Sequence, residues 1–407
     1  MAGLALFSLK DPSLLAFQKR ARDPNLRAVF GLKGVPSDTQ MREVLDEVHP
    51  DQVRPIFQDV FRQLQRGKVL EEYAFLEGCY LVALDGVEYF TSEKVHCAHC
   101  MTRKHRDGTT SYYHQMLGAV VIHPDFPEVI PLAPEPIQRQ DGHNKNDCER
   151  NAARRWLRRF RKDHPHLPVI VVEDALSSNA PHVRDLRAEG CHFILGVKPG
   201  DHAYLFDEFS RRLQAGEAEE VEATDPDGTL HLYQFANGLS LNESNPEERV
   251  SLVLHVQTSA DGKEEYGGTW VTDFRVRARN VRQVARGGRC RWRIENETYN
   301  TLKNQGYHFE HNYGHGEKNL SVVLALLMMQ AFLIDQVQQR CNKLFGQAWE
   351  KAGAKSTLWE AVRHLFYSFE VASMRQIYEA IAFGYVRPAL APLIGQARPV
   401  LQTLDTS

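Results

Sequence analysis

The segment at residues 167–174, LPVIVVED, constrains the fold of this chain more than any other feature. Its four consecutive β-branched residues leave no polar face, which is typical of a central strand covered by helices on both sides. Helices are expected before it, over residues 146–162, and after it, near residues 182–189. A further strand, CHFILGVKP, follows. This alternation predicts an α/β architecture.

Three more strands are expected upstream, in the segments CYLVALDGVEYF, SYYHQMLGAVVIHP and EVIPLAP. Each segment is rich in β-branched and aromatic residues and is bounded by Gly, Pro or Asp, which favour turns. Because the three segments follow one another closely, we expect neighbouring antiparallel strands. Together with the later alternation, they predict a mixed sheet flanked by helices.

Changes of periodicity divide the chain into regions. After the core, period-2 segments separated by Asp-Gly turns indicate an inserted β-subdomain. Helical character returns after Asn280, is expected to break or kink at Gly287-Gly288, and continues to the end of the chain. The predicted regions are an N-terminal helical domain over 1–75, the first part of the α/β core over 76–215, the inserted β-subdomain over 216–280, the second part of the core over 281–345, and a C-terminal helical region over 346–407.

The longest apolar stretch, residues 320–337, contains Ser321, Gln330 and Asp335. These polar residues favour a buried helix over a membrane span. The N-terminus has no basic segment ahead of its interrupted apolar stretch, so no secretory signal is expected. The seven cysteines lack the spacing of a disulfide framework and are expected to be reduced. The sequence therefore predicts a cytoplasmic protein without a membrane partner.

The charge balance limits how this chain could bind nucleic acid. A formal net charge of -3 argues against binding by bulk charge, so any DNA site must be local. Two basic stretches qualify: residues 148–163 carry seven Arg or Lys, and residues 282–304 carry six. Each stretch taken alone is also compatible with a solvated helix face.

Two acids stand where strands end. Asp85 follows LVAL, and Asp174 follows VIVVE. Buried acids are costly unless they are paired or coordinate a metal, although each could also serve a turn or a helix cap. Oxygen-only ligands favour Mg²⁺ or Mn²⁺, and two such ions about 4 Å apart can drive in-line displacement at phosphorus. Glu173 is a rival to Asp174, but strand alternation would point it to the opposite face.

A third acid is expected on a later helix, in the segment RWRIE. On a regular helix Arg291, Glu295 and Tyr299 share one face, which places an acid beside a basic group and an aromatic ring. This combination suits a surface that binds metal and phosphate. Glu295 is the expected third ligand, and Glu297 remains an alternative.

The three acid motifs together resemble the insertion-sequence DDE transposases. The resemblance is carried by LDG at 84–86, VEDALSSNAP at 172–181 and RWRIENETYNTLKNQGY at 291–307, with the β-rich insertion between the last two. It implies an RNase H-like core in which Asp85 and Asp174 are the two catalytic aspartates and Glu295 is the glutamate, binding Mg²⁺ or Mn²⁺ as two ions. It also implies cleavage and strand transfer of double-stranded DNA at terminal inverted repeats, by a homo-oligomer assembled on DNA.

Many relatives with the β insertion carry a Tyr-Arg-Glu-Lys signature. Arg291 and Glu295 keep its Arg-to-Glu spacing, but Gly288 stands where the Tyr is expected. Lys303 lies eight residues after Glu295 rather than seven, which rotates it about 80° away on a regular helix. A subgroup variant or a local helix distortion would explain this spacing. The residues expected to contact DNA are Arg291, Lys303, Arg154 and Arg158.

Two other functions fit the same carboxylates. One is an RNase H-like DNA nuclease without strand transfer, which the β insertion disfavours. The other is a transposase-derived DNA-binding protein that has lost its catalytic activity.

The pair Cys97-x-x-Cys100 has half of a zinc-site spacing. His114 and Cys148 could supply further ligands through the fold. Because no second half is evident in the sequence, a loop with free thiols is the favoured interpretation, with zinc as the alternative.

Overall fold

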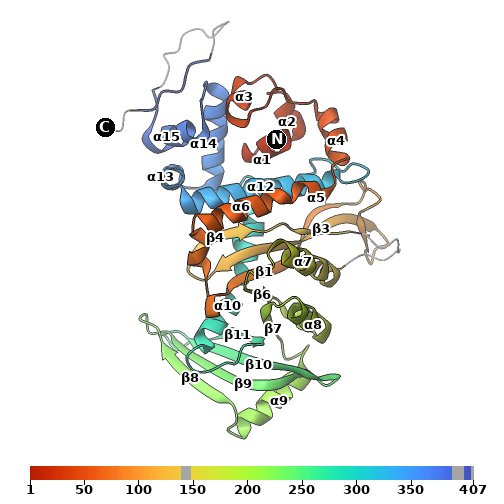
Figure 1. Ribbon diagram of the computed structural model, residues 1–407, viewed down its shortest axis with the longest axis vertical. Helices are drawn as coiled ribbons and strands as arrows, with labels where there is room; N and C mark the ends of the chain where they lie inside the picture. The colour runs from red at the N-terminus through yellow and green to blue at the C-terminus, as the bar shows by residue number, and fades with distance from the viewer. Residues whose placement is uncertain (139–147, 387–397, 405–407) are drawn as a thin grey trace.

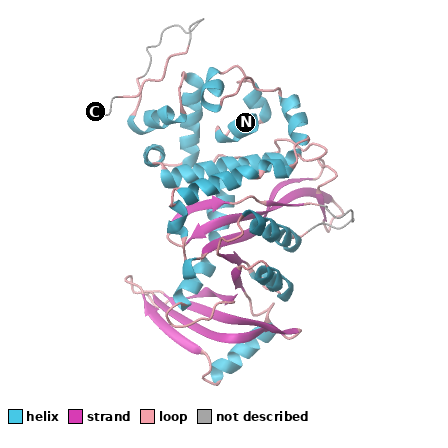
Figure 2. Ribbon diagram, viewed as in Figure 1, coloured by secondary structure: helices cyan, strands magenta, loops and turns pink. Residues whose placement is uncertain are grey.

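The computed structural model describes residues 1–138, 148–386 and 398–404. Figure 1 shows three tiers along the long axis: helices from both ends of the chain, then the first strands, then a second group of strands at the far end. Figure 2 shows that helices dominate the first tier and strands the other two.

The middle tier contains the strands expected from the sequence. β1 (Tyr80–Ser92) pairs antiparallel with β3 (Thr110–His123) and parallel with β6 (Val169–Glu173). β6 in turn pairs parallel with β7 (His192–Gly196). Three short strands pair with β3, namely β2 (Met101–Lys104), β4 (Phe126–Pro131) and β5 (Glu135–Ile137). The predicted mixed α/β sheet is therefore confirmed.

The β-rich insertion extends this same sheet. It comprises β8 (Glu219–Thr224), β9 (Leu230–Asn242), β10 (Asn245–Thr258) and β11 (Glu264–Thr272). β11 pairs antiparallel with β7, so the strand order runs β2-β3-β1-β6-β7-β11-β10-β9-β8. α9 (Ala203–Gln214) leads into the insertion and packs on β9. The insertion is thus joined to the core through backbone hydrogen bonds.

Helices cover both faces of the core strands. α7 (Glu149–Asp163) and α8 (Ala180–Ala188) lie on the side seen in Figure 1, with the short η3 (Ala175–Ser177) before α8. The other face is covered by α10 (Val281–Arg289), a π-helix (Ile294–Asn300) and α11 (Thr301–Asn304). The predicted start of α7 at Asn146 lies outside the described residues.

Close packing explains why Gly287 and Gly288 do not break α10, contrary to the sequence-based expectation. A Cβ atom on Gly288 would lie 2.4 Å from the Trp270 indole nitrogen, and one on Gly287 would lie 3.0 Å from Ile194. The two glycines therefore let the helix approach the sheet. The same contact explains why a tyrosine cannot stand at position 288.

Helices from the two ends of the chain form one layer. Asn25 donates hydrogen bonds to the carbonyls of Phe366 and Phe369, and Tyr367 donates one to Asp11. The N-terminal elements are α1 (Ala2–Ser8), α2 (Leu14–Gln18), α3 (Pro24–Phe30), α4 (Asp38–Asp46), α5 (Pro50–Val53), α6 (Pro55–Arg66), η1 (Val69–Tyr73) and η2 (Leu76–Gly78). The C-terminal elements are α13 (Lys343–Ala352), α14 (Lys355–Ser368) and α15 (Met374–Phe383).

The chain was predicted to be helical to its end, but the described residues beyond α15 are not helical. Beyond α15, Val386 donates to the carbonyl of Gln402, and Glu370 donates to that of Pro399. These are backbone bonds between extended segments. Within the predicted C-terminal region, residues 387–397 and 405–407 lie outside the described part of the chain.

α12 (Leu320–Cys341) lies between the terminal helices and the sheet. Among the described residues it is the one helix long and apolar enough to cross a membrane, yet 83% of its most apolar window is buried inside the fold. Two of its polar side chains are bonded inside the fold: Gln330 donates to the Val53 carbonyl, and Asp335 accepts from Lys10 and Tyr307. These contacts agree with the predicted buried helix.

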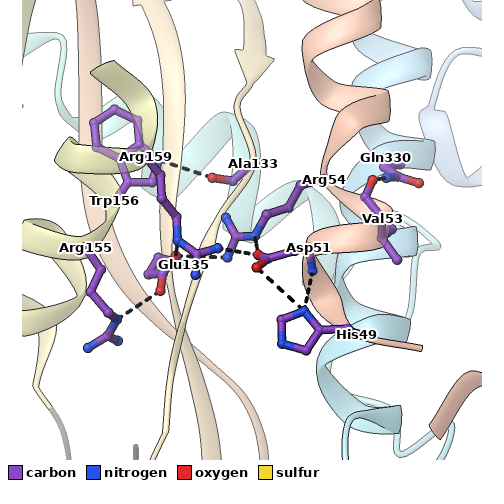
Figure 3. Close-up of polar contacts among 10 residues, drawn as sticks. All are labelled: His49, Asp51, Val53, Arg54, Ala133, Glu135, Arg155, Trp156, Arg159 and Gln330. Atoms are coloured by element: carbon purple, nitrogen blue, oxygen red, sulfur yellow. Dashed lines mark hydrogen bonds and ion pairs between the residues drawn. The ribbon is translucent and has the colours of Figure 1, made fainter. Parts of the chain in front are cut away.

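A buried carboxylate joins the N-terminal helices to the core (Figure 3). Glu135, on β5, lies 2.9 Å from Arg54 at the start of α6 and 2.9 Å from Arg155 on α7. Arg159 approaches the same carboxylate and also pairs with Asp51. Glu135 is 1% exposed and Arg54 is 8% exposed, so water cannot replace either partner.

Glu135→Gln is expected to lower the free energy of unfolding by about 3 kcal/mol, because Arg54 would lose its buried counter-ion and keep only the half-exposed Asp51, 3.1 Å away. Denaturant unfolding of both proteins measures the change. Glu88→Gln is the matched control, since Glu88 pairs with the exposed Arg103 and its loss should cost under about 1 kcal/mol. Equal stability losses in the two variants would contradict a special role for the buried network.

Candidate active site

The sequence predicted Asp85 at a strand end, but Gly86 pairs with Leu117 and continues the strand, so Asp85 lies in the middle of β1, between β3 and β6. It pairs with Gly118 across the antiparallel ladder, so the two residues share one face of the sheet. A Cβ atom on Gly118 would lie 2.3 Å from the Tyr299 hydroxyl, which places this face under the π-helix. Gly86, one residue on, faces the other way toward Glu149 of α7.

Asp174 follows β6 directly. Ala83 is opposite Val172 in the parallel ladder, so the same register brings position 174 level with Asp85. One oxygen of Asp174 accepts a hydrogen bond from the Leu176 amide, 3.0 Å away, and caps η3. The strand end and the following turn therefore hold this carboxylate beside β1.

Glu173 is directed into the interior, in keeping with strand alternation. Its carboxylate lies 2.5 Å from the Nε2 atom of His182 on α8 and accepts from the Ser177 hydroxyl. Burial alone would lower the pKa of His182, but the charge of Glu173 and its hydrogen bond raise that pKa above its ordinary value. Glu173 is thus engaged in an internal pair and Asp174 in the turn beside Asp85.

Glu295 stands at the start of the π-helix. Its carboxylate lies 2.6 Å from one nitrogen of Arg291, and another nitrogen of that guanidinium lies 3.9 Å from the Asp85 carboxylate. Arg291 therefore joins the first and third predicted acids. The predicted face shared by Arg291, Glu295 and Tyr299 is directed toward β1.

Tyr299 fixes the π-helix on the sheet. Its hydroxyl donates a 2.6 Å hydrogen bond to the backbone carbonyl of Asp85, in the space that Gly118 leaves open. Burial raises the pKa of Tyr299 well above its ordinary value, so the phenol stays protonated and remains a donor. The position of Glu295 relative to Asp85 is therefore set by one buried contact.

The wide turns of the π-helix also account for the position of Lys303. A π-helix has hydrogen bonds from i to i+5 and about 4.4 residues per turn, so five steps inside it rotate the chain about 90° less than an α-helix does. This nearly cancels the 80° offset expected for the eight-residue spacing from Glu295. Lys303 pairs with Glu310 at 2.7 Å. A local helix distortion is therefore present where the spacing departs from the family pattern.

Crowding of carboxylates changes the acidity of Asp85. Burial raises the pKa of its carboxyl to about 7. Arg291 opposes this rise, whereas the charges of Glu295, Glu149 and Asp174 add to it. The charges of these three acids therefore reach Asp85, although Glu149 lies on the opposite face of the sheet.

Glu149 is a site residue that sequence reasoning missed. It begins α7, accepts a 2.8 Å hydrogen bond from Gln115 on β3, and lies where a side chain on Gly86 would be. Burial raises the pKa of Glu149, and the neighbouring Asp174 raises it further. The sequence shows Glu149 only as one acid within a basic stretch, so its role depended on the tertiary fold.

The basic residues of α7 have mixed roles. Arg155 and Arg159 belong to the Glu135 network in Figure 3, and Arg161 donates to backbone carbonyls including that of Glu189. These three arginines support the fold. The two that were expected to contact DNA are exposed: Arg154 pairs with Asp185 of α8 at 2.8 Å, and Arg158 faces solvent.

Arginines also line a pocket of about 250 Å³ between α10 and the insertion. Its lining residues include Arg282, Arg286, Arg289, Arg293 and the exposed Trp292. The pocket begins on α10 and reaches the residues just before Glu295, so a basic surface adjoins the helix that carries the third acid.

The predicted thiol pair lies elsewhere, in the loop between β1 and β2. Cys97 and Cys100 face His114 of β3 and His315 of the loop before α12. Cys148, the other expected partner, is the N-cap of α7 and does not belong to this group. His315 has no ligand-like spacing in the sequence, because 215 residues separate it from Cys100.

Comparison with known proteins identifies no family: no protein-family model matches this chain, and no curated protein is similar to it. The function of the site is therefore inferred from its own residues.

Proposed function

We propose that this chain is a DDE transposase with an RNase H-like core, which cleaves DNA at the ends of an insertion sequence and joins those ends to target DNA. The observation that carries the proposal is the juxtaposition of Asp85, Asp174 and Glu295. They come from the middle of β1, the end of β6 and the π-helix, and Arg291 joins the first acid to the third. Three acids that converge beside a single arginine carry more negative charge than that partner balances, which is typical of sites that bind a metal.

The donor set fits a hard divalent cation. Asp85, Asp174 and Glu295 offer oxygen ligands only, and the pKa of Asp85 is raised chiefly by burial, with smaller contributions from Glu295 and Asp174. These three residues would hold Mg²⁺ or Mn²⁺, as two ions, and the bound metal would activate a nucleophile and stabilise the leaving oxygen at phosphorus. Arg291 keeps Asp85 and Glu295 together in the metal-free protein.

The arginine-lined pocket supports a DNA substrate. Arg282 and Arg286 pair with Asp225 and Asp125, but all four side chains are between 31% and 55% exposed. Exposed ion pairs contribute little stability, so phosphate groups can replace these carboxylates at small cost. Trp292, 43% exposed, offers a surface on which a base can stack. DNA bound in this pocket would lie next to the helical segment that carries Glu295.

The strand arrangement supports the RNase H-like part of the proposal. Antiparallel strands come first in the chain, followed by two parallel strands that are each reached through a helix. This is the arrangement expected from the sequence for such a core. The strand order does not bear on whether the cleaved end is then joined to target DNA. That step is tested by the DNA substrates of the assay below.

A cleavage and joining assay tests the proposal. Full-length protein is incubated with a duplex carrying the DNA that flanks its own reading frame, a target plasmid, and Mg²⁺ or Mn²⁺. We expect metal-dependent cleavage that leaves a 3′-hydroxyl at the end of the flanking repeat, followed by joining of that end to the plasmid. Denaturing gels map the cleavage, and sequencing of plasmid junctions detects the joining.

Asp174→Asn is the inactive control and Asp59→Asn the matched surface control, because Asp59 is an exposed aspartate of α6 paired with Arg62. Cleavage without joining would favour a nuclease over a transposase. Absence of cleavage by the wild-type protein with either metal would refute both.

A further inference from the structure

Four metal-binding side chains converge at a place outside the proposed active site. Cys97 and Cys100 come from the loop between β1 and β2, His114 from β3, and His315 from the loop before α12. Their ligand atoms all lie within 4.8 Å of one another. Three separate segments of the chain therefore contribute to one group.

The distances within this group match a tetrahedral zinc site. The two sulfur atoms are 3.9 Å apart, and the Nε2 atom of His114 lies 3.4 Å from the sulfur of Cys97 and 3.5 Å from that of Cys100. With Zn–S bonds of about 2.3 Å and Zn–N bonds of about 2.0 Å, the corners of a tetrahedron are about 3.8 Å apart for S···S and about 3.5 Å for S···N. His315 approaches Cys100 more closely, at 3.0 Å, so only this side chain must move to complete the tetrahedron.

The surroundings favour a closed site. Cys100 and His114 are each 1% exposed. Tyr89 stacks on the His114 ring at 5.9 Å between centroids, and Phe90 packs on His315 at 4.4 Å. Aromatic rings therefore enclose the two imidazoles of the group.

We propose that Cys97, Cys100, His114 and His315 bind one structural Zn²⁺ ion. Four protein ligands fill its coordination shell, so no position remains for water or substrate, and the ion has no catalytic role. The thiols must lose their protons on binding, which gives two thiolates and two neutral imidazoles and leaves the site without net charge. Soft sulfur ligands with imidazole select zinc over Mg²⁺.

The role of the ion follows from the segments that it joins. His315 lies between α11, which continues the π-helix bearing Glu295, and the central helix α12. The ion would tie this connection to β3, the strand that pairs with β1 beside Asp85. It would therefore stabilise the sheet edge and the helical segment together.

Metal analysis of full-length protein, purified without chelators from zinc-supplemented medium, should give about one equivalent of zinc. Removing the metal with a chelator should lower the Tm by at least about 5 °C, and returning zinc should restore it. Replacement by Co²⁺ should produce the visible absorption of a tetrahedral ion together with a sulfur-to-metal charge-transfer band. These measurements require no variant and do not depend on transposase activity.

Substitutions assign the ligands. Cys100→Ser and His315→Ala should each lose most of the zinc. Cys148→Ser and His99→Ala should retain it, because Cys148 is an exposed thiol outside the group and His99 lies between the two cysteines without belonging to it. Metal-free wild-type protein with a Tm that is insensitive to chelator would overturn the proposal, as would full zinc retention in both ligand variants.

Discussion

Asp85→Asn is expected to reduce Mg²⁺-dependent DNA cleavage by about a thousandfold or more, because the substitution removes a charged metal ligand at the centre of the sheet. Single-turnover cleavage of the end duplex measures the loss. DNA binding should change little, since Asp85 is partly buried beneath Arg291 and is not part of the arginine-lined pocket. Cleavage at the wild-type rate would refute the assignment of Asp85.

The same substitution should stabilise the metal-free fold, which distinguishes a ligand from an ordinary structural residue. The pKa of Asp85 rises from 3.8 to about 7 on folding, so between about pH 4 and pH 7 the unfolded chain has lost this proton while the folded chain keeps it. The free energy of unfolding of the wild type therefore falls as pH rises through that window, by up to about 1.4 kcal/mol per pH unit, and levels off above pH 7. The asparagine side chain does not titrate in this range, so the free energy of unfolding of the variant lacks this dependence on pH.

The Tm of Asp85→Asn should consequently exceed that of the wild type by a margin that grows from pH 4 to pH 7 and is constant above it. Mg²⁺ should then raise the Tm of the wild type but not that of the variant, since only the wild type binds the ion. Asp59→Asn, at an exposed position paired with Arg62, is the control and should show neither effect. If Asp85→Asn were less stable than the wild type at pH 8, the idea that the charged Asp85 carboxylate destabilises the metal-free fold would be wrong.

Patterns of local sequence were enough to predict the sheet and the two aspartates on neighbouring strands, of which only Asp174 stands at a strand end. The run LPVIVVED became β6, and LDG placed Asp85 on β1, because a buried strand must be apolar and an acid within it is conspicuous. The return of helical periodicity after Asn280 likewise located Glu295. These features are encoded by residues adjacent in the sequence.

Contacts between distant segments could not be predicted in this way. Gly118 is one glycine among 27 in the sequence, and only the structure places the Tyr299 hydroxyl against it. The charge of Glu149 reaches Asp85, whereas Arg155 and Arg159 hold Glu135. The basic stretch on α7 looked uniform in the sequence because charge alone does not reveal which side chains have partners within the fold.

Glu295→Gln is expected to abolish Mg²⁺-dependent cleavage, again by about a thousandfold or more, while Glu297→Gln keeps near wild-type activity. The two acids lie two residues apart on the π-helix and have different surroundings. Glu295 contacts Arg291 and, through it, Asp85. Glu297 acts instead on Lys355 of α14: burial lowers the pKa of that lysine, and the charge of Glu297 opposes the lowering. Glu297 is therefore directed toward the terminal helices.

This difference gives each variant a second readout. Glu295→Gln should bind end DNA as tightly as the wild type or more tightly, since a negative charge near the phosphates is removed, and fluorescence anisotropy at fixed salt measures this. Glu297→Gln should instead lower the Tm slightly, because the buried Lys355 loses a counter-charge. If Glu297→Gln were inactive and Glu295→Gln cleaved normally, the catalytic glutamate would be Glu297. Because Tyr299 anchors the helix to the Asp85 carbonyl, the π-helix would then have to rotate by about half a turn on binding DNA, and that hydrogen bond would have to break.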